Sequence, residues 1–121
     1  SELPLPLAWS PDFAGAATIE VYPGAMLAVR KLSKAPYKQP NETAGRTGIA
    51  DALVQARLLD RLNAEVSARA AANDDVLDAI LCMVAARDFV MGECATPDEA
   101  HLGQIQREGW IWLRRTEFER A

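Results

Sequence analysis

The stretch "NDDVLDAILCMVAARDF", residues 73–89, joins an acidic start to a run of apolar residues. On a helix, successive residues turn by about 100°, so the large apolar side chains of this stretch point in several directions. A helix of that kind packs inside a domain rather than on its surface. The stretch therefore predicts a core helix headed by three aspartates, Asp74, Asp75 and Asp78.

One stripe of this helix carries mainly small side chains. It runs through Asp75, Asp78, Ala79, Cys82, Ala86 and Phe89. Small side chains let another element approach closely, and a sheet is the element we expect there. Asp75 and Asp78 would then lie at the rim of the sheet, one turn apart, and could converge on a divalent metal ion as hard oxygen ligands.

Helix capping is the alternative explanation of the acidic start. Asn73 is a favoured N-cap residue, and Asp74 and Asp75 in the first turn gain about 0.3–1 kcal/mol each from the helix dipole. Asp78 lies in the second turn, where capping does not reach. A carboxylate on a buried helix is costly unless it is paired or coordinated, so both possibilities stay open for Asp78.

The segments before this helix predict a short strand followed by helices. "ATIEVYP", residues 17–23, alternates β-favouring residues and ends at a proline, so Glu20 points away from its two neighbours. By itself this pattern favours a solvated position for Glu20. Residues 23–32 predict a short helix with proline in its first turn, and residues 43–72 predict helix with a possible break near Asn63.

The segments after this helix predict one more helix and one extended segment. Thr96 is expected to cap a helix that has Pro97 at its first position and ends near Arg107. "GWIWL", residues 109–113, is expected to be a strand or an extended segment.

Composition limits the class of protein. A chain of 121 residues that is 50% apolar fits one domain. No run of about 20 apolar residues and no signal-peptide pattern is present, so we expect a cytoplasmic protein with no membrane partner. We expect Cys82 and Cys94 to be free thiols, because their spacing fits neither a zinc site nor a redox motif. A net charge of −4 argues against general nucleic-acid binding.

The remaining site candidates have ordinary structural explanations. We expect His101, the only histidine, to be a surface residue, and Trp110 and Trp112 to pack in the core. Three lysines between residues 31 and 38 could meet phosphate, but scattered lysines are usually only solvated. They are Lys31, Lys34 and Lys38.

Four sequence blocks together resemble one family. They are "IEVYPGAML" (19–27), Tyr37-Lys38, "DDVLDAILCMVAARDF" (74–89) and "EGWIWL" (108–113). Their order and spacing are similar to the later part of the domain of unknown function 429 family, predicted nucleases of the RNase H-like superfamily. The resemblance implies an α/β fold, of which this chain is the C-terminal portion, predominantly helical with one or two short strands. It covers most of residues 17–113.

The resemblance also implies a function. In that superfamily a strand glutamate and helix aspartates help to hold two Mg²⁺ or Mn²⁺ ions that hydrolyse phosphodiesters in nucleic acid. Those positions match Glu20, Asp75 and Asp78 here, so they are the expected catalytic and metal-binding residues. The alternatives are a non-catalytic interaction or regulatory module on the same fold, and a small-molecule phosphoesterase.

One departure from the family pattern concerns the start of the domain. The family begins with a strand that bears an early aspartate, followed by its hairpin partners, and fewer than 20 residues precede Glu20 here. We therefore expect residues 1–16 to be an irregular lead-in, residues 17–113 to be the C-terminal part of one RNase H-like domain, and residues 114–121 to be a tail. Without the sheet, the stripe of small residues would be exposed, and we expect the fragment to be inactive and to form a homo-oligomer.

Overall fold

The computed structural model describes residues 7–12, 15–33 and 35–116. Lys34, parts of the expected lead-in and most of the expected tail lie outside these ranges. The described part is mainly helical, as predicted, and no helix in it is long and apolar enough to cross a membrane. Its elements are α1 (Pro23–Arg30), α2 (Thr43–Gln55), α3 (Ala64–Ala72), α4 (Asp74–Val90), the 3₁₀ turn η1 (Glu99–His101) and α5 (Leu102–Glu108).

The helices before and including α4 follow the sequence pattern closely. The break predicted near Asn63 is confirmed, because Asn63 caps α3 by accepting a hydrogen bond from the backbone N–H of Val66 at 2.8 Å. Asn73 caps α4 in the same way and accepts from the N–H of Asp75 at 2.8 Å. The capping explanation of the acidic start is therefore correct for the first turn of α4.

The strand expected at residues 17–23 is not formed, and residues 109–113 are extended without forming a strand, in the part of the chain that the structure describes. The segments around residues 17–23 and 109–113 are extended, but they make only isolated bridges, such as the parallel bridge between Glu20 and Ile111. The backbone N–H of Trp112 donates to the carbonyl of Glu20 at 3.0 Å. A strand needs a run of such bonds with a neighbour, and these segments each find a partner for only one or two residues.

The start of the last helical segment was predicted wrongly. Thr96 and Pro97 are not in a helix, and the helical turn begins two residues later at Glu99. The cap is Asp98, whose carboxylate accepts from the backbone N–H of Ala100 at 3.0 Å. A short polar cap at Asp98 thus outcompetes the cap expected at Thr96.

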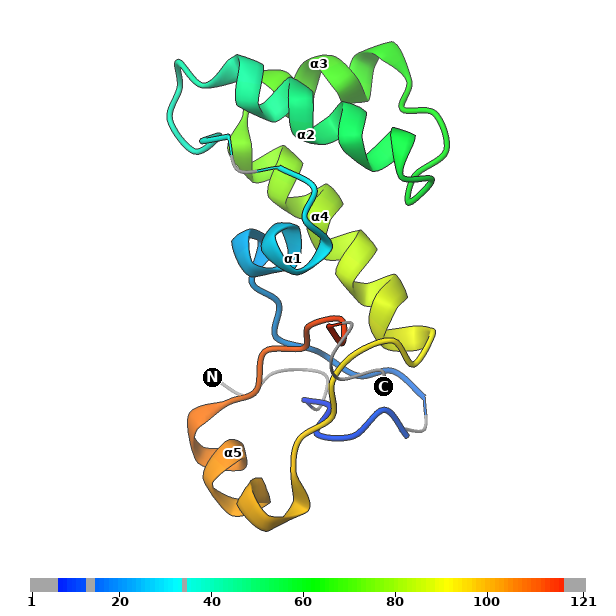
Figure 1. Ribbon diagram of the computed structural model, residues 1–121, viewed down its shortest axis with the longest axis vertical. Coiled ribbons are helices and arrows are strands. Elements are labelled where there is room, and N and C mark those ends of the chain that lie inside the picture. The colour runs from blue at the N-terminus through cyan, green and yellow to red at the C-terminus, as the bar shows by residue number, and fades with distance from the viewer. Residues whose placement is uncertain (1–6, 13–14, 34, 117–121) are drawn as a thin grey trace.

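Two clusters of buried side chains hold the fold together. The larger one contains residues of α1, α2, α3 and α4, among them Ile49, Leu53, Leu77 and Leu81. In Figure 1, α2 and α3 lie side by side at one end of the molecule, α1 lies against the middle of α4, and α5 is at the other end. Helix α4 thus runs from one end of the molecule toward the other and contacts three other helices.

The smaller cluster lies at the carboxyl end of α4. Trp112 is 1% exposed there, and its indole N–H donates to the carbonyl of Ala8 at 3.1 Å. Phe89 packs edge-on against it, with ring centroids 4.8 Å apart. The predicted packing role of Trp112 is confirmed, and Cys94 in the same cluster is a free thiol, as is the exposed Cys82.

The small-residue stripe of α4 does not rest on a sheet. Ala79, Cys82 and Ala86 are exposed, and only Phe89 at the end of the stripe is buried. Helix α4 is buried instead through its large side chains, which face α1, α2 and α3.

Helix α2 approaches the preceding loop very closely at Gly45. A Cβ atom placed on this glycine would lie 1.9 Å from the carbonyl oxygen of Pro36, which is a backbone atom and cannot rotate away. Gly48, one turn further along α2, has no heavy atom within 4 Å of the same position. Only Gly45 is therefore required by packing.

These two glycines give a matched test of the packing. We expect Gly45→Ala to lower the free energy of unfolding by at least about 2 kcal/mol through overpacking. We expect Gly48→Ala to raise it by about 0.5–1 kcal/mol, because alanine restricts the unfolded helix segment. Urea denaturation followed by circular dichroism measures both, and equal stabilities of the two variants would contradict the close approach of α2 to Pro36.

Candidate site at the amino end of α4

Three carboxylates gather at the amino end of α4. Asp74, Asp75 and Asp78 each place one oxygen so that the three lie within 4.8 Å of one another. Asp75 is exposed, and the other two are half-buried. Two of the three expected ligands are thus brought together, and Asp74 joins them, whereas Glu20 is not a member of this group.

Glu20 lies in the extended segment before α1. Its side chain is exposed, and a Cβ atom added to Gly109 would lie 2.9 Å from its carboxylate oxygens. Gly109 also has a φ of +97°, which side chains rarely tolerate. The carboxylate of Glu20 therefore lies beside the turn that ends α5.

Asp78 is paired within the protein. Tyr37 donates its hydroxyl hydrogen bond to one carboxylate oxygen at 2.9 Å, and the ammonium of Lys38 contacts the other oxygen. The same ammonium lies 3.7 Å from the carboxylate of Asp74. These partners offset the cost of placing a carboxylate in the second turn of α4, which helix capping does not explain.

Arg46 places Tyr37 and Lys38 against α4. Its side chain is 1% exposed, and its guanidinium donates to the carbonyls of Tyr37 at 2.8 Å, Gln39 at 2.7 Å and Ala71 at 2.7 Å. It thereby ties the loop before α2 to the end of α3. Because α4 begins directly after α3, this anchor fixes the loop relative to the carboxylates.

The pairing changes the acidity of both loop residues. Burial raises the pKa of Tyr37 to about 12, and the hydrogen bond to Asp78 acts in the same direction. The hydrogen bond to Asp78 likewise raises the pKa of Lys38 above its usual value. Lys38 is therefore a firmly protonated cation next to the carboxylates, and Tyr37 is a hydrogen-bond donor rather than a base.

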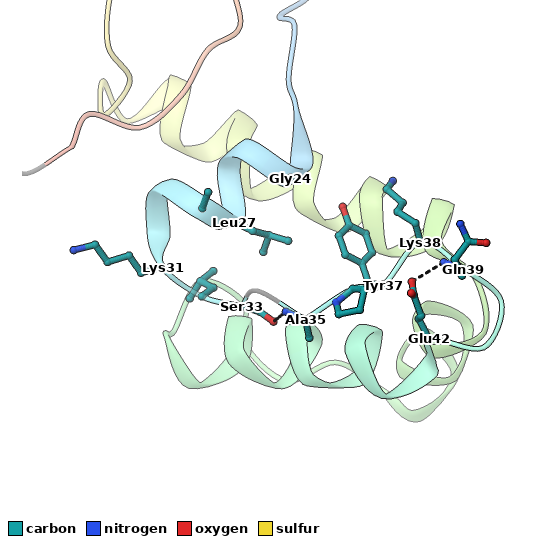
Figure 2. Close-up of a pocket in the computed structure, with 12 residues that line it drawn as sticks. Gly24, Leu27, Lys31, Ser33, Ala35, Tyr37, Lys38, Gln39 and Glu42 are labelled. Atoms are coloured by element: carbon teal, nitrogen blue, oxygen red, sulfur yellow. Dashed lines mark hydrogen bonds between the residues drawn. The ribbon is translucent and has the colours of Figure 1, made fainter.

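A pocket of about 820 Å³ lies beside the cluster. Its lining is mainly apolar and comes from α1 and the loop before α2 (Figure 2). Lys31 and Lys38 lie at opposite ends of it, and Glu42 accepts a hydrogen bond from the backbone N–H of Gln39 at 2.8 Å at the end nearer Lys38. Tyr37 and Lys38 line the pocket and also contact the carboxylate of Asp78.

Sequence reasoning missed the loop that completes the cluster. Lys38 was expected to be solvated. Tyr37 was one of the residues that resemble the family, but no role was assigned to it. Both are about 40 residues from Asp78 along the chain, and neither has a periodic pattern that points to α4. Arg46 gave no signal because an arginine on a helix is ordinarily exposed.

Titration of Tyr37 tests the pairing with Asp78. In a Tyr22→Phe background Tyr37 is the only tyrosine, and tyrosinate absorbance should give a midpoint near pH 12. Asp78→Asn should lower the midpoint, because it removes the carboxylate that favours the protonated phenol. Since folded Tyr37 keeps its proton to a higher pH than the unfolded chain, its contribution to stability is complete below about pH 10 and is lost between about pH 10 and 12.

Asp75→Asn is the control for this titration. It removes the same charge from the preceding turn of α4, but its carboxylate makes no hydrogen bond to Tyr37 in the described structure. An equal fall of the midpoint in both variants would contradict a specific bond between Tyr37 and Asp78.

Comparison with known proteins gives one match, to a family model. No curated protein and no solved structure matches the chain. One family model, described as "Protein of unknown function (DUF429)", matches residues 8–102. The match includes α1 to α4 and therefore all three clustered aspartates, with Tyr37, Lys38 and Glu20. Because the model covers more than half of the chain, the chain belongs to the DUF429 family of proteins of unknown function.

Proposed function

We propose that this chain supplies part of a divalent-metal site for the hydrolysis of phosphodiesters in nucleic acid, on an RNase H-like scaffold. The observation that supports the proposal is the group of three carboxylates at the amino end of α4, each with one oxygen within 4.8 Å of the others. Oxygen ligands of this kind suit Mg²⁺ and Mn²⁺. The family resemblance supplies the reaction class.

The donor set fits a divalent cation, with one condition. Two carboxylates, Asp74 and Asp78, already share the ammonium of Lys38, which is itself half-exposed. A metal ion must displace that ammonium to reach both of them. The exposed position of Lys38 allows this movement, since its long side chain can turn into solvent.

Each residue has a definite part in the proposed site. Asp74, Asp75 and Asp78 would hold the cation, which supplies a bound water of lowered pKa and charge stabilisation at the phosphate. Tyr37 would keep the Asp78 carboxylate oriented through its hydroxyl hydrogen bond. In the RNase H-like arrangement a further carboxylate comes from a strand that precedes the glutamate strand, so we assign cleavage to the polypeptide that carries it.

A non-catalytic interaction module is the second candidate. The observation that favours it is the apolar surface of α4, where Met83 is 66% and Val90 is 72% exposed. Exposed large apolar side chains close together on one helix suggest a surface for association, and a second copy of the chain is the partner we expect. In this case Lys38 is a permanent partner of the aspartates rather than a group that a metal displaces.

Thermal melts with chelator and with millimolar Mn²⁺ test the metal site. We expect Mn²⁺ to raise the melting temperature of the chain, because it binds only the folded cluster. Asp78→Asn should weaken Mn²⁺ binding by at least about tenfold, because it removes one of the three carboxylates proposed to hold the ion. Asp51→Asn, an exposed aspartate on α2, removes the same charge elsewhere and should leave the Mn²⁺ shift intact.

Lys38→Met separates the two candidate functions. If a metal competes with the ammonium, this variant should melt lower with chelator, since three carboxylates lose their compensating charge, and should bind Mn²⁺ more tightly than the wild type. If the chain is an interaction module, neither protein should respond to Mn²⁺, and light scattering should show a concentration-dependent dimer that Met83→Lys disrupts.

A cleavage assay then tests the reaction itself. Labelled single-stranded and double-stranded DNA and RNA are incubated in Mn²⁺ with residues 1–121 and with a longer polypeptide that also carries the additional carboxylate strand. We expect no cleavage by residues 1–121 alone and metal-dependent cleavage by a product that carries the additional carboxylate strand. Cleavage by the longer polypeptide that survives Asp78→Asn would remove Asp78 from the site.

A further inference from the structure

Four arginines line a second pocket, at the carboxyl end of α4. The pocket has a volume of about 300 Å³, and its charged lining consists of Arg30, Arg57, Arg87 and Arg114 with Asp88 and Glu93. Four cations against two carboxylates leave a net positive charge. The whole chain has a net charge of −4, so this concentration of arginine runs against its overall character.

One of these arginines is buried and not fully bonded. The side chain of Arg30 is 8% exposed and pairs with Asp88, whose side chain is 7% exposed. This pair occupies one terminal nitrogen of the guanidinium. The Nε of Arg30 is also buried, and it makes no hydrogen bond to any residue in the ranges that the structure describes. A buried donor without a hydrogen bond is costly, so Asp88 does not fully satisfy the guanidinium of Arg30.

A second arginine repeats this feature. The Nε of Arg114 is buried without a hydrogen bond in the described part of the chain, and it lies 4.0 Å from the nearest carboxylate oxygen of Glu93. Arg87 of α4 also lines the pocket, and one of its terminal nitrogens donates to the carbonyl of Leu58 at 3.4 Å. Arg57 is exposed at the rim.

We propose that this pocket binds a phosphate group. Guanidinium groups offer several N–H donors in a plane, which match the oxygens of a phosphate and bind it more strongly than neutral donors do. Arg57 and Arg87 are exposed and supply accessible N–H donors, while Arg30 and Arg114 add positive charge to the lining. The source of the phosphate is either the backbone of a nucleic acid or a small phosphorylated molecule, and the two are distinguished below.

Arg57 occupies a backbone position that normally favours glycine. Its φ is +59°, in the left-handed region, at the end of α2. The backbone bonds from Arg57 to the carbonyl of Val54 and from Leu58 to that of Leu53 form the usual left-handed helix ending, in which glycine is the common residue. An arginine there carries a conformational cost, and its side chain lines the pocket.

The phosphate pocket does not depend on the proposed metal site. None of its residues is among the three clustered aspartates. Asp78 and Asp88 are about ten residues apart on α4, which is roughly 15 Å along a helix. Failure of Mn²⁺ to bind would therefore leave this proposal standing, and failure of phosphate to bind would leave the metal proposal standing.

Calorimetric titration with sodium phosphate tests the pocket, with sodium chloride at the same ionic strength as the reference. We expect saturable binding of phosphate to the wild-type chain. Arg87→Ala and Arg57→Gly should each weaken it by about tenfold, as loss of one charged hydrogen bond does. Arg57→Gly should leave the melting temperature without phosphate unchanged or higher, because glycine relieves the left-handed backbone. Loss of binding in this variant then cannot result from unfolding.

Two control variants match these changes. Lys31→Gly makes the same replacement of a basic residue at a left-handed helix end, with φ of 55°, but Lys31 lies outside the arginine pocket. Arg107→Ala removes an exposed arginine from α5. Both should bind phosphate as the wild type does. Equal loss in these controls, or no phosphate binding by the wild type beyond that of chloride, would overturn the proposal.

Competition identifies the source of the phosphate. A fluorescently labelled single-stranded oligonucleotide is titrated with the chain, and inorganic phosphate and a nucleoside monophosphate are then added. Binding of the oligonucleotide that Arg87→Ala weakens assigns the pocket to a nucleic-acid backbone. Binding of phosphate or the monophosphate without binding of the oligonucleotide assigns it to a small phosphorylated molecule.

Discussion

The buried guanidinium of Arg46 is the interaction on which the amino end of α4 depends. It bonds to backbone carbonyls of the loop at Tyr37, Gln39 and Pro40 and to that of Ala71 in α3, and no carboxylate partner for it is found in the described structure. Carbonyl groups that point at one cation offset the cost of burying its charge. The same anchor pulls the loop so close to α2 that only glycine fits at position 45. Position 45 and position 46 are thus two parts of one constraint.

Charge on α4 is divided between its two ends. The amino end holds three carboxylates, two of which share the ammonium of Lys38, and the carboxyl end holds Asp88 against Arg30, with further arginines around it. Asp74 and Asp78 pair with Lys38 of the loop before α2. Asp88 pairs with Arg30 of α1. The helix can therefore be both a core element and a carrier of charged groups, because its buried and half-buried carboxylates are paired with cations while its large apolar side chains pack in the core.

Part of this arrangement could be read from local sequence. The helices at 23–30, 43–55, 64–72 and 74–90 follow from apolar periodicity, proline position and asparagine caps, which act within a few residues. The convergence of Asp75 and Asp78 follows from helical spacing in the same way. The extended segments at 17–23 and 109–113 were recognised but not their pairing, because a strand requires a partner whose position local sequence does not give.

The sequence by itself determined the mainly helical character, the acidic head of α4, the two free thiols and the family to which the chain belongs. Only the tertiary structure decided that Lys38 and Tyr37 meet Asp78, that Asp74 takes a place in the carboxylate group while Glu20 does not, and that four arginines share one pocket. The physical reason is the range of the interactions. Caps and helical periodicity act over one or two turns, whereas the meeting of Tyr37 and Lys38 with Asp78 and the grouping of the four arginines join residues 27 to 84 positions apart and form only after the core has packed.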